Sequence, residues 1–134
     1  MPTLPWTVCR YTPDDQAALH VLASTLPLDR YGDVPRFMRW ALRIRRQLAR
    51  AEGCAGYSLD AWLTHKTFFT LSAWSSAEAM NAFVNSGDHA RMLTDMAGRL
   101  GQSTFVESTA SASQLPLDWS AAKRRLADAA AQQG

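Results

Sequence analysis

Hydrophobic residues recur at every third or fourth position after Asp33, and this spacing predicts an amphipathic helix over residues 33–52. Asp33 suits the N-cap, and Pro35 is tolerated in the first turn because its missing amide proton would have no helical partner. Gly53 is a typical residue to end such a helix. The predicted buried stripe consists of Val34, Phe37, Met38, Ala41, Ile44 and Leu48.

Two segments with alternating polarity, 55–64 and 66–74, predict a β-hairpin with His65 at its turn. Tyr57, Leu59, Ala61 and Leu63 share one face of the first segment. The second segment has Phe68, Thr70, Ser72 and Trp74 on one face and Phe69, Leu71 and Ala73 on the other. Because both faces carry apolar residues, we expect both sides of the sheet to be covered.

Weaker signals surround these elements. Residues 18–28 favour a strand, although their leucines and alanines leave a helix open, and residues 5–13 are compatible with a short edge strand. Ser75 and Glu78 have the spacing of a capping box, which predicts a helix that is interrupted at Ser86-Gly87. Asp88 is then expected to cap a second helical piece, and residues 103–111 to form the last strand.

A C-terminal helix is predicted over about 118–131, beginning at Asp118, with Trp119, Ala122 and Leu126 facing inward. The predicted order is β-α-β-β-α-β plus this helix, in a single domain over 1–134. An α+β fold, the ferredoxin-like split βαβ sandwich, suits that order, with helices on one face of the sheet. The other face needs a cover, and we therefore expect a homodimer through the open sheet face.

Composition narrows the function classes. Apolar residues make up 47% of the chain, and 14 Lys/Arg against 12 Asp/Glu give a net charge of only +2. This balance argues against a dedicated nucleic-acid-binding protein, and no segment reaches the length of a membrane-spanning helix. The start of the chain lacks the pattern of a secretory signal, and the two cysteines lack CxxC spacing. We therefore expect a cytoplasmic protein.

The run KTFFTLSAWSSAEAMNAFVNSGDHARM (66–92) resembles the antibiotic-biosynthesis-monooxygenase-like group of dimeric α+β barrel proteins. Segments 28–59 and 115–119 are similar to the branch of that group described as spheroidene-monooxygenase-like. The resemblance implies a dimeric α+β barrel and a range of reactions that includes cofactor-free quinol oxidation and haem chemistry. Haem-degrading members carry a distal tryptophan where this chain has Phe83, and they carry an asparagine that the first strand lacks.

His89 is the strongest single candidate for chemistry, because it follows a glycine break at the start of a helical piece. An imidazole there is able to act as a base near neutral pH or to ligate haem iron. A histidine that only packs against the sheet is the competing interpretation. Arg91, close to His89 in sequence, is a candidate partner for a substrate carboxylate. His20 is expected to be a packed histidine, and His65 a solvated one.

A cavity is expected beside the predicted sheet, with Trp74, Phe68, Thr70 and Ser72 on its wall, together with Phe83 and Met92. Apolar walls with few hydroxyls suit a small hydrophobic or aromatic ligand. Ordinary core packing is the alternative. Six arginines (36, 39, 43, 45, 46 and 50) spread around the first predicted helix, which favours a solvated face over a phosphate or haem-propionate site.

The sequence thus predicts a small monooxygenase-like enzyme acting on an apolar or polycyclic substrate. His89 is its base if no cofactor is used and the axial ligand if haem is bound. The alternative is a non-catalytic dimer that binds a hydrophobic ligand or haem.

Overall fold

A five-stranded antiparallel sheet forms the centre of the computed structural model, which describes residues 3–133. Its strands are β1 (Thr3–Val8), β2 (Ala18–Pro27), β3 (Cys54–Trp62), β4 (Thr67–Trp74) and β5 (Thr104–Ser111), in the spatial order β1-β3-β4-β2-β5. The helices are α1 (Val34–Arg50), α2 (Ala77–Val84), α3 (Gly87–Asp95) and α4 (Trp119–Gln133). Strands β2 to β5 with their crossover helices form the predicted ferredoxin-like α+β arrangement, and β1 adds an edge strand beside β3.

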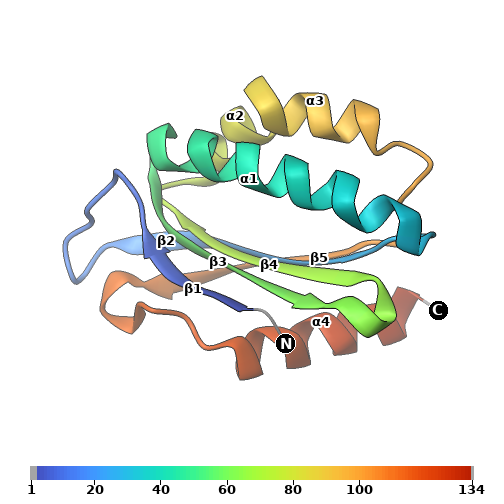
Figure 1. Ribbon diagram of the computed structural model, residues 1–134. Helices are drawn as coiled ribbons and strands as arrows, with labels where there is room; N and C mark the ends of the chain where they lie inside the picture. Colours follow the sequence, from blue (N-terminus) through green and yellow to red (C-terminus); the bar gives the residue numbers. More distant parts are fainter. Residues whose placement is uncertain (1–2, 134) are drawn as a thin grey trace.

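Three helices lie on one face of the sheet and the fourth lies on the other (Figure 1). Helices α1, α2 and α3 cover the first face. Alternation along β4 places Phe68 and Trp74 on that side, and Leu71 and Ala73 on the side of α4. The predicted division of the hairpin into two apolar faces is confirmed.

The second face is not open, because α4 of the same chain packs across it. Ala122 and Leu126 of α4 are buried against Val21, Ala23 and Leu71, as the inward stripe of the predicted helix requires. The prediction that this sheet face is uncovered in a single chain is therefore wrong. The periodicity of α4 specified a buried stripe but not the surface that receives it. The homodimer itself stays a prediction.

Two predicted helix caps are displaced: the cap of α2 by one residue, and the cap of α3 by two residues, from Asp88 to Ser86. Ser76, rather than Ser75, caps α2 by accepting a hydrogen bond from the Ala79 amide at 3.1 Å. Asp33 stands at the N-cap of α1, but its carboxylate makes no cap hydrogen bond and instead accepts one from Arg99 at 3.0 Å. Asp118 does accept from the Ser120 amide at 3.1 Å, in agreement with the predicted start of α4.

The edge strand is shorter than the predicted segment 5–13, because β1 ends at Val8. Strand β2 settles the ambiguity of 18–28 in favour of a strand. The β3–β4 turn contains His65, and α1 is followed by Gly53 with a positive φ of 81°. In the part of the chain that the structure describes, no helix is both long enough and apolar enough to cross a bilayer.

Candidate functional site

A cavity of about 420 Å³ is lined by residues of the sheet and of α1, α2 and α3. The even-numbered residues of β4 form its floor. Each pairs with a residue of β2 across the ladder, including Phe68 with Leu26 and Ser72 with Leu22. All six residues predicted for this wall line the cavity, namely Phe68, Thr70, Ser72, Trp74, Phe83 and Met92.

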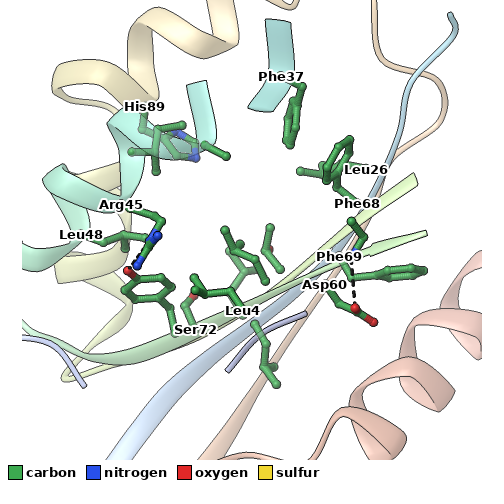
Figure 2. Close-up of a pocket in the computed structure, with 18 of the residues that line it drawn as sticks. Leu4, Leu26, Phe37, Arg45, Leu48, Asp60, Phe68, Phe69, Ser72 and His89 are labelled. Atoms are coloured by element: carbon green, nitrogen blue, oxygen red, sulfur yellow. Dashed lines mark hydrogen bonds between the residues drawn. The ribbon is translucent and has the colours of Figure 1, made fainter. Parts of the chain in front are cut away.

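Two apolar clusters form the two ends of the cavity. At one end, the Phe37 and Phe68 rings are 4.5 Å apart between centroids. At the other end, Trp74 and Phe83 are 5.1 Å apart. Figure 2 shows Phe37, Phe68 and Leu26 on one side, opposite Arg45, Leu48 and His89. The cavity therefore has an end formed mainly by apolar side chains and an end where Arg45 and His89 lie.

The two hydroxyls on the floor are already engaged within the protein. Thr70 shares a hydrogen bond with Ser24, and Ser72 Oγ accepts from Trp74 Nε1 at 2.9 Å. These pairs leave few polar groups on the floor for a ligand. The floor therefore presents mainly apolar surface to the cavity.

His89 lies in the first turn of α3 and lines the polar end of the cavity (Figure 2). Its Nδ1 is 3.0 Å from the Val84 carbonyl oxygen. A carbonyl only accepts hydrogen bonds, so Nδ1 carries the proton and Nε2 keeps its lone pair in the neutral ring. Burial lowers the pKa of His89 below its ordinary value of 6.5, against an upward effect of the Val84 hydrogen bond. The imidazole is consequently neutral at pH 7.

Gln47 of α1 holds His89 in this position. Its Oε1 accepts from the His89 amide at 2.8 Å, and its Nε2 donates to the Ser86 carbonyl at 2.8 Å. One side chain thereby fixes the junction between α2 and α3. The Phe83 ring lies beside the imidazole, with 5.1 Å between centroids. Gln47 received no role in the sequence analysis, because a glutamine on a helix carries no signal of this kind.

Arg45 is a second polar group of the cavity that the sequence analysis did not single out. Its Nε donates to the hydroxyl oxygen of buried Tyr57 at 3.2 Å. Both residues line the cavity, and Arg45 is half-buried. A signal was available, because Arg45 lies three residues from both Leu42 and Leu48, on the edge of the apolar stripe of α1.

Arg91 is not brought to the cavity. Its side chain is 72% exposed and pairs with Asp88 at 3.1 Å. Residues two apart on a helix point in nearly opposite directions, so His89 and Arg91 cannot face the same cavity. The expectation that Arg91 binds a substrate there is contradicted by its position. Met92, three residues after His89, does line the cavity.

The other two histidines lie elsewhere. His20 is largely buried and its Nε2 is 2.6 Å from Glu107. His65 is exposed at the hairpin turn, where its ring stacks on Trp62 with 3.6 Å between centroids. Among residues 3–133, no group of three or more His, Cys, Asp or Glu side chains is placed to hold a metal ion.

The cavity opens where apolar residues of α1 reach the surface. Met38 is 43% exposed and Leu42 is 56% exposed, although both line the cavity. Leu63, after β3, is also exposed and lines it. These side chains form an apolar mouth, which an apolar ligand would contact on entry.

Asp60 anchors α4 to the opposite side of the sheet. Its buried carboxylate accepts from Thr3 Oγ1 at 2.6 Å, from the Ala61 amide at 3.0 Å and from Lys123 of α4. Burial acts to raise the pKa of Asp60, but the hydrogen bonds from Lys123 and Thr3 and the Lys123 charge outweigh it and lower the pKa. We assign this pair a structural role.

No protein-family model matches the chain, and no curated protein sequence matches it. Solved structures do match. A Pseudomonas aeruginosa protein aligns with a TM-score of 0.60 and 17% identity over 69% of this chain and 94% of its own. A Nitrosomonas europaea protein, provisionally described as an antibiotic biosynthesis monooxygenase, aligns with a TM-score of 0.58 and 10% identity over 76% of this chain and 94% of its own.

A third match is a Fusobacterium nucleatum protein provisionally described as a monooxygenase, with a TM-score of 0.64 and 7% identity over 79% of this chain and 50% of its own. Another matched protein, from Nitrosomonas europaea, is of unknown function. The chain shares the α+β, ferredoxin-like fold of these solved structures. Identities this low show the fold alone, and one fold supports many reactions.

Proposed function

We propose that the protein is an oxygenase-type enzyme that oxidises a flat, apolar substrate in the cavity without a bound cofactor. The observation that carries this proposal is the state of His89. Its Nδ1–H is committed to the Val84 carbonyl, and burial keeps the ring neutral, so that Nε2 is a free base at neutral pH. The monooxygenase descriptions of two structural neighbours agree with this chemistry.

The reaction begins when His89 removes a proton from an activated CH₂ group of the substrate. The resulting carbanion supplies the electrons that reduce dioxygen, and a C–O bond forms. Protonation of the peroxide by the imidazolium gives a hydroperoxide. Loss of water then leaves a ketone, so that R–CH₂–R′ and O₂ become R–CO–R′ and H₂O. No external reductant enters this balance.

The cavity walls contribute by excluding water from the reacting atoms. Trp74 and Phe83 lie at the end where His89 lies, while Phe37 and Phe68 form the apolar end. A dry, aromatic environment orients a flat substrate and keeps the carbanion from being reprotonated by solvent.

A haem-dependent reaction is the second candidate, and it also depends on Nε2 of His89. A histidine whose Nδ1–H is oriented by a carbonyl is suited to bind iron through Nε2. His89 would therefore be the residue that holds the iron of a bound haem. Bound haem would supply dioxygen activation, and this chain would supply the ligand and the apolar walls. A dimer that binds a hydrophobic ligand without turnover is the remaining alternative.

Oxygen uptake with anthrone, a tricyclic ketone with an acidic CH₂ group, tests the main proposal. We expect the wild type to consume one O₂ for each carbonyl formed. His89→Gln keeps a donor for the Val84 carbonyl but lacks the basic nitrogen, and should lower the rate at least about 100-fold. His65→Ala, a histidine substitution outside the cavity, is the matched control and should retain full activity.

If anthrone binds but no oxygen is consumed, the result would contradict the proposed oxygenase activity. It would support a protein that binds a hydrophobic ligand without turnover. Titration with hemin distinguishes the haem-dependent reaction from the cofactor-free one. A saturable Soret shift at one haem per chain, lost in His89→Ala but kept in His65→Ala, would assign His89 to iron. The cofactor-free proposal predicts full oxygen uptake in protein that shows no Soret band.

A further inference from the structure

We infer that Arg45 and Tyr57 form the binding site for a carboxylate group on an otherwise apolar, aromatic ligand of this cavity. The inference deepens the proposed function, because it rests on the same cavity being the ligand site. It assigns the substrate class as aromatic acids, with the ring system inside and the carboxylate at the polar end near the mouth.

The first argument is the position of Arg45 on α1. The arginines at 39, 43, 46 and 50 lie on exposed parts of the helix, and Arg36 pairs with Asp95 at 3.0 Å. Arg45 instead occupies the edge of the apolar stripe, on the same side as Met38 and Leu42 of the mouth. A charged residue at an apolar position requires an explanation, since an aliphatic residue there would bury at lower cost.

The second argument is that Arg45 has unused hydrogen-bonding capacity. Across residues 3–133, no carboxylate lies within ion-pair distance of Arg45, whereas Arg36, Arg91 and Arg99 each have one. Its Nε is bound to Tyr57, which leaves the two terminal nitrogens of the guanidinium. Those nitrogens present several N–H donors in one plane, which matches the two oxygens of a carboxylate.

The third argument is the state of the Tyr57 hydroxyl. Its oxygen accepts from Arg45 Nε, so its own proton is available to an acceptor. In the part of the chain that the structure describes, the Tyr57 hydroxyl takes part only in this hydrogen bond, as its acceptor. Figure 2 shows Arg45 on the same side of the cavity as His89. The hydrogen bond between Arg45 and Tyr57 brings donors from α1 and β3 together at that end.

Charge selects a monoanion. Arg45 is the single Lys or Arg side chain among the described lining residues. Asp60 also lines the cavity, but Lys123 and Thr3 already bind its carboxylate. One positive charge balances one carboxylate, whereas a phosphate dianion would leave a net charge against apolar walls. Because Arg45 is half-buried at the mouth, the ligand's carboxylate would remain partly solvated while its ring system fills the apolar end.

A matched pair of probes tests the inference: 2-naphthoate and its neutral isostere 2-naphthamide, each titrated by calorimetry at pH 7. We expect 2-naphthoate to bind the wild type about 10- to 100-fold more tightly than the amide, as expected for hydrogen bonds to a charged group. Arg45→Met should bring the two affinities together without weakening amide binding. Tyr57→Phe should reduce the preference in part, and Arg46→Met, an exposed neighbour on α1, should leave it unchanged.

Three outcomes would overturn the inference. Equal affinity of the wild type for both probes would overturn the carboxylate site and leave the proposed oxygenase function intact. If Arg45→Met and Arg46→Met reduce the preference for 2-naphthoate equally, the preference would be a general effect of surface charge. Failure of both probes to bind, or binding that survives filling of the cavity in the folded variant Ala41→Trp, would count against the cavity site and the proposed function together.

Discussion

The state of His89 has a consequence for stability that is independent of any reaction. Burial lowers the pKa of the folded-state imidazole below 6.5, so the unfolded chain binds a proton more readily than the native protein does. The native state is therefore favoured above the unfolded pKa, and that stability is lost as the pH falls from about 6.5 towards the lower folded-state pKa. At this scale, one buried ring links folding to pH.

We expect urea unfolding of the wild type to show lower stability at pH 5 than at pH 7.5. His89→Gln should show a smaller difference between the two pH values, because it removes the group that titrates. An NMR titration of the His89 ring should give a midpoint below 6.5. A midpoint at or above 6.5 would mean that the imidazole is solvated, and would also weaken its assignment as a base that is free at neutral pH.

At the residue scale, the sequence predicts which face of a strand a side chain occupies better than it predicts the partners of side chains on helices. Alternation along β4 was sufficient to place Phe68 and Trp74 on one wall, because a strand has only two faces. Arg91 was assigned by proximity in sequence to His89, although helical geometry places the two on opposite sides. Arg45 was grouped with five other arginines, although its place at the edge of the apolar stripe set it apart, and its hydrogen bond to Tyr57 was beyond what the sequence predicts.

At the scale of elements, one side chain of α1 fixes the junction between α2 and α3. Gln47 accepts from the His89 amide and donates to the Ser86 carbonyl. Gln47→Ala should therefore cost about 1 kcal/mol of stability, the usual contribution of a hydrogen bond, and leave the start of α3 free to move. We expect the NMR midpoint of His89 to rise towards 6.5 in this variant as the ring becomes more solvated.

An unchanged His89 titration in Gln47→Ala would show that Phe83 and the Val84 carbonyl hold the ring without help. Arg46→Ala changes the adjacent, exposed position of α1 and is the control. Its effect on stability should be small, and it should not alter the titration of His89.

The Asp60–Lys123 pair links another element, α4, to the sheet. Lys123→Met leaves the buried Asp60 carboxylate without its cation, and we expect it to lower the free energy of unfolding by about 2 kcal/mol. Asp60→Asn combined with Lys123→Met should cost less than the sum of the two single changes. Additive costs in this double-mutant cycle, measured by urea unfolding, would show that the two residues stabilise the fold independently.

At the scale of the whole molecule, the position of α4 decides what surface the protein presents. The sequence predicted the helix and its inward-facing residues Ala122 and Leu126, but it assigned the cover of the second sheet face to another subunit rather than to this helix. Local periodicity reports only that a helix face is buried. The structure assigns it to β2, β4 and β5 of the same chain, so an uncovered sheet face no longer argues for a homodimer.

A truncated chain that ends at Asp118 tests this role of α4. Without the helix, the face that carries Val21, Ala23 and Leu71 would be an exposed apolar surface, and such surfaces drive association. Light scattering should therefore find the truncated chain in larger species than the full chain. The same measurement on the full chain tests the homodimer, which would have a mass of about 29.6 kDa, twice the 14.8 kDa of one chain. If the truncated protein contains the same number of chains per particle as the full chain, α4 does not protect this face from association.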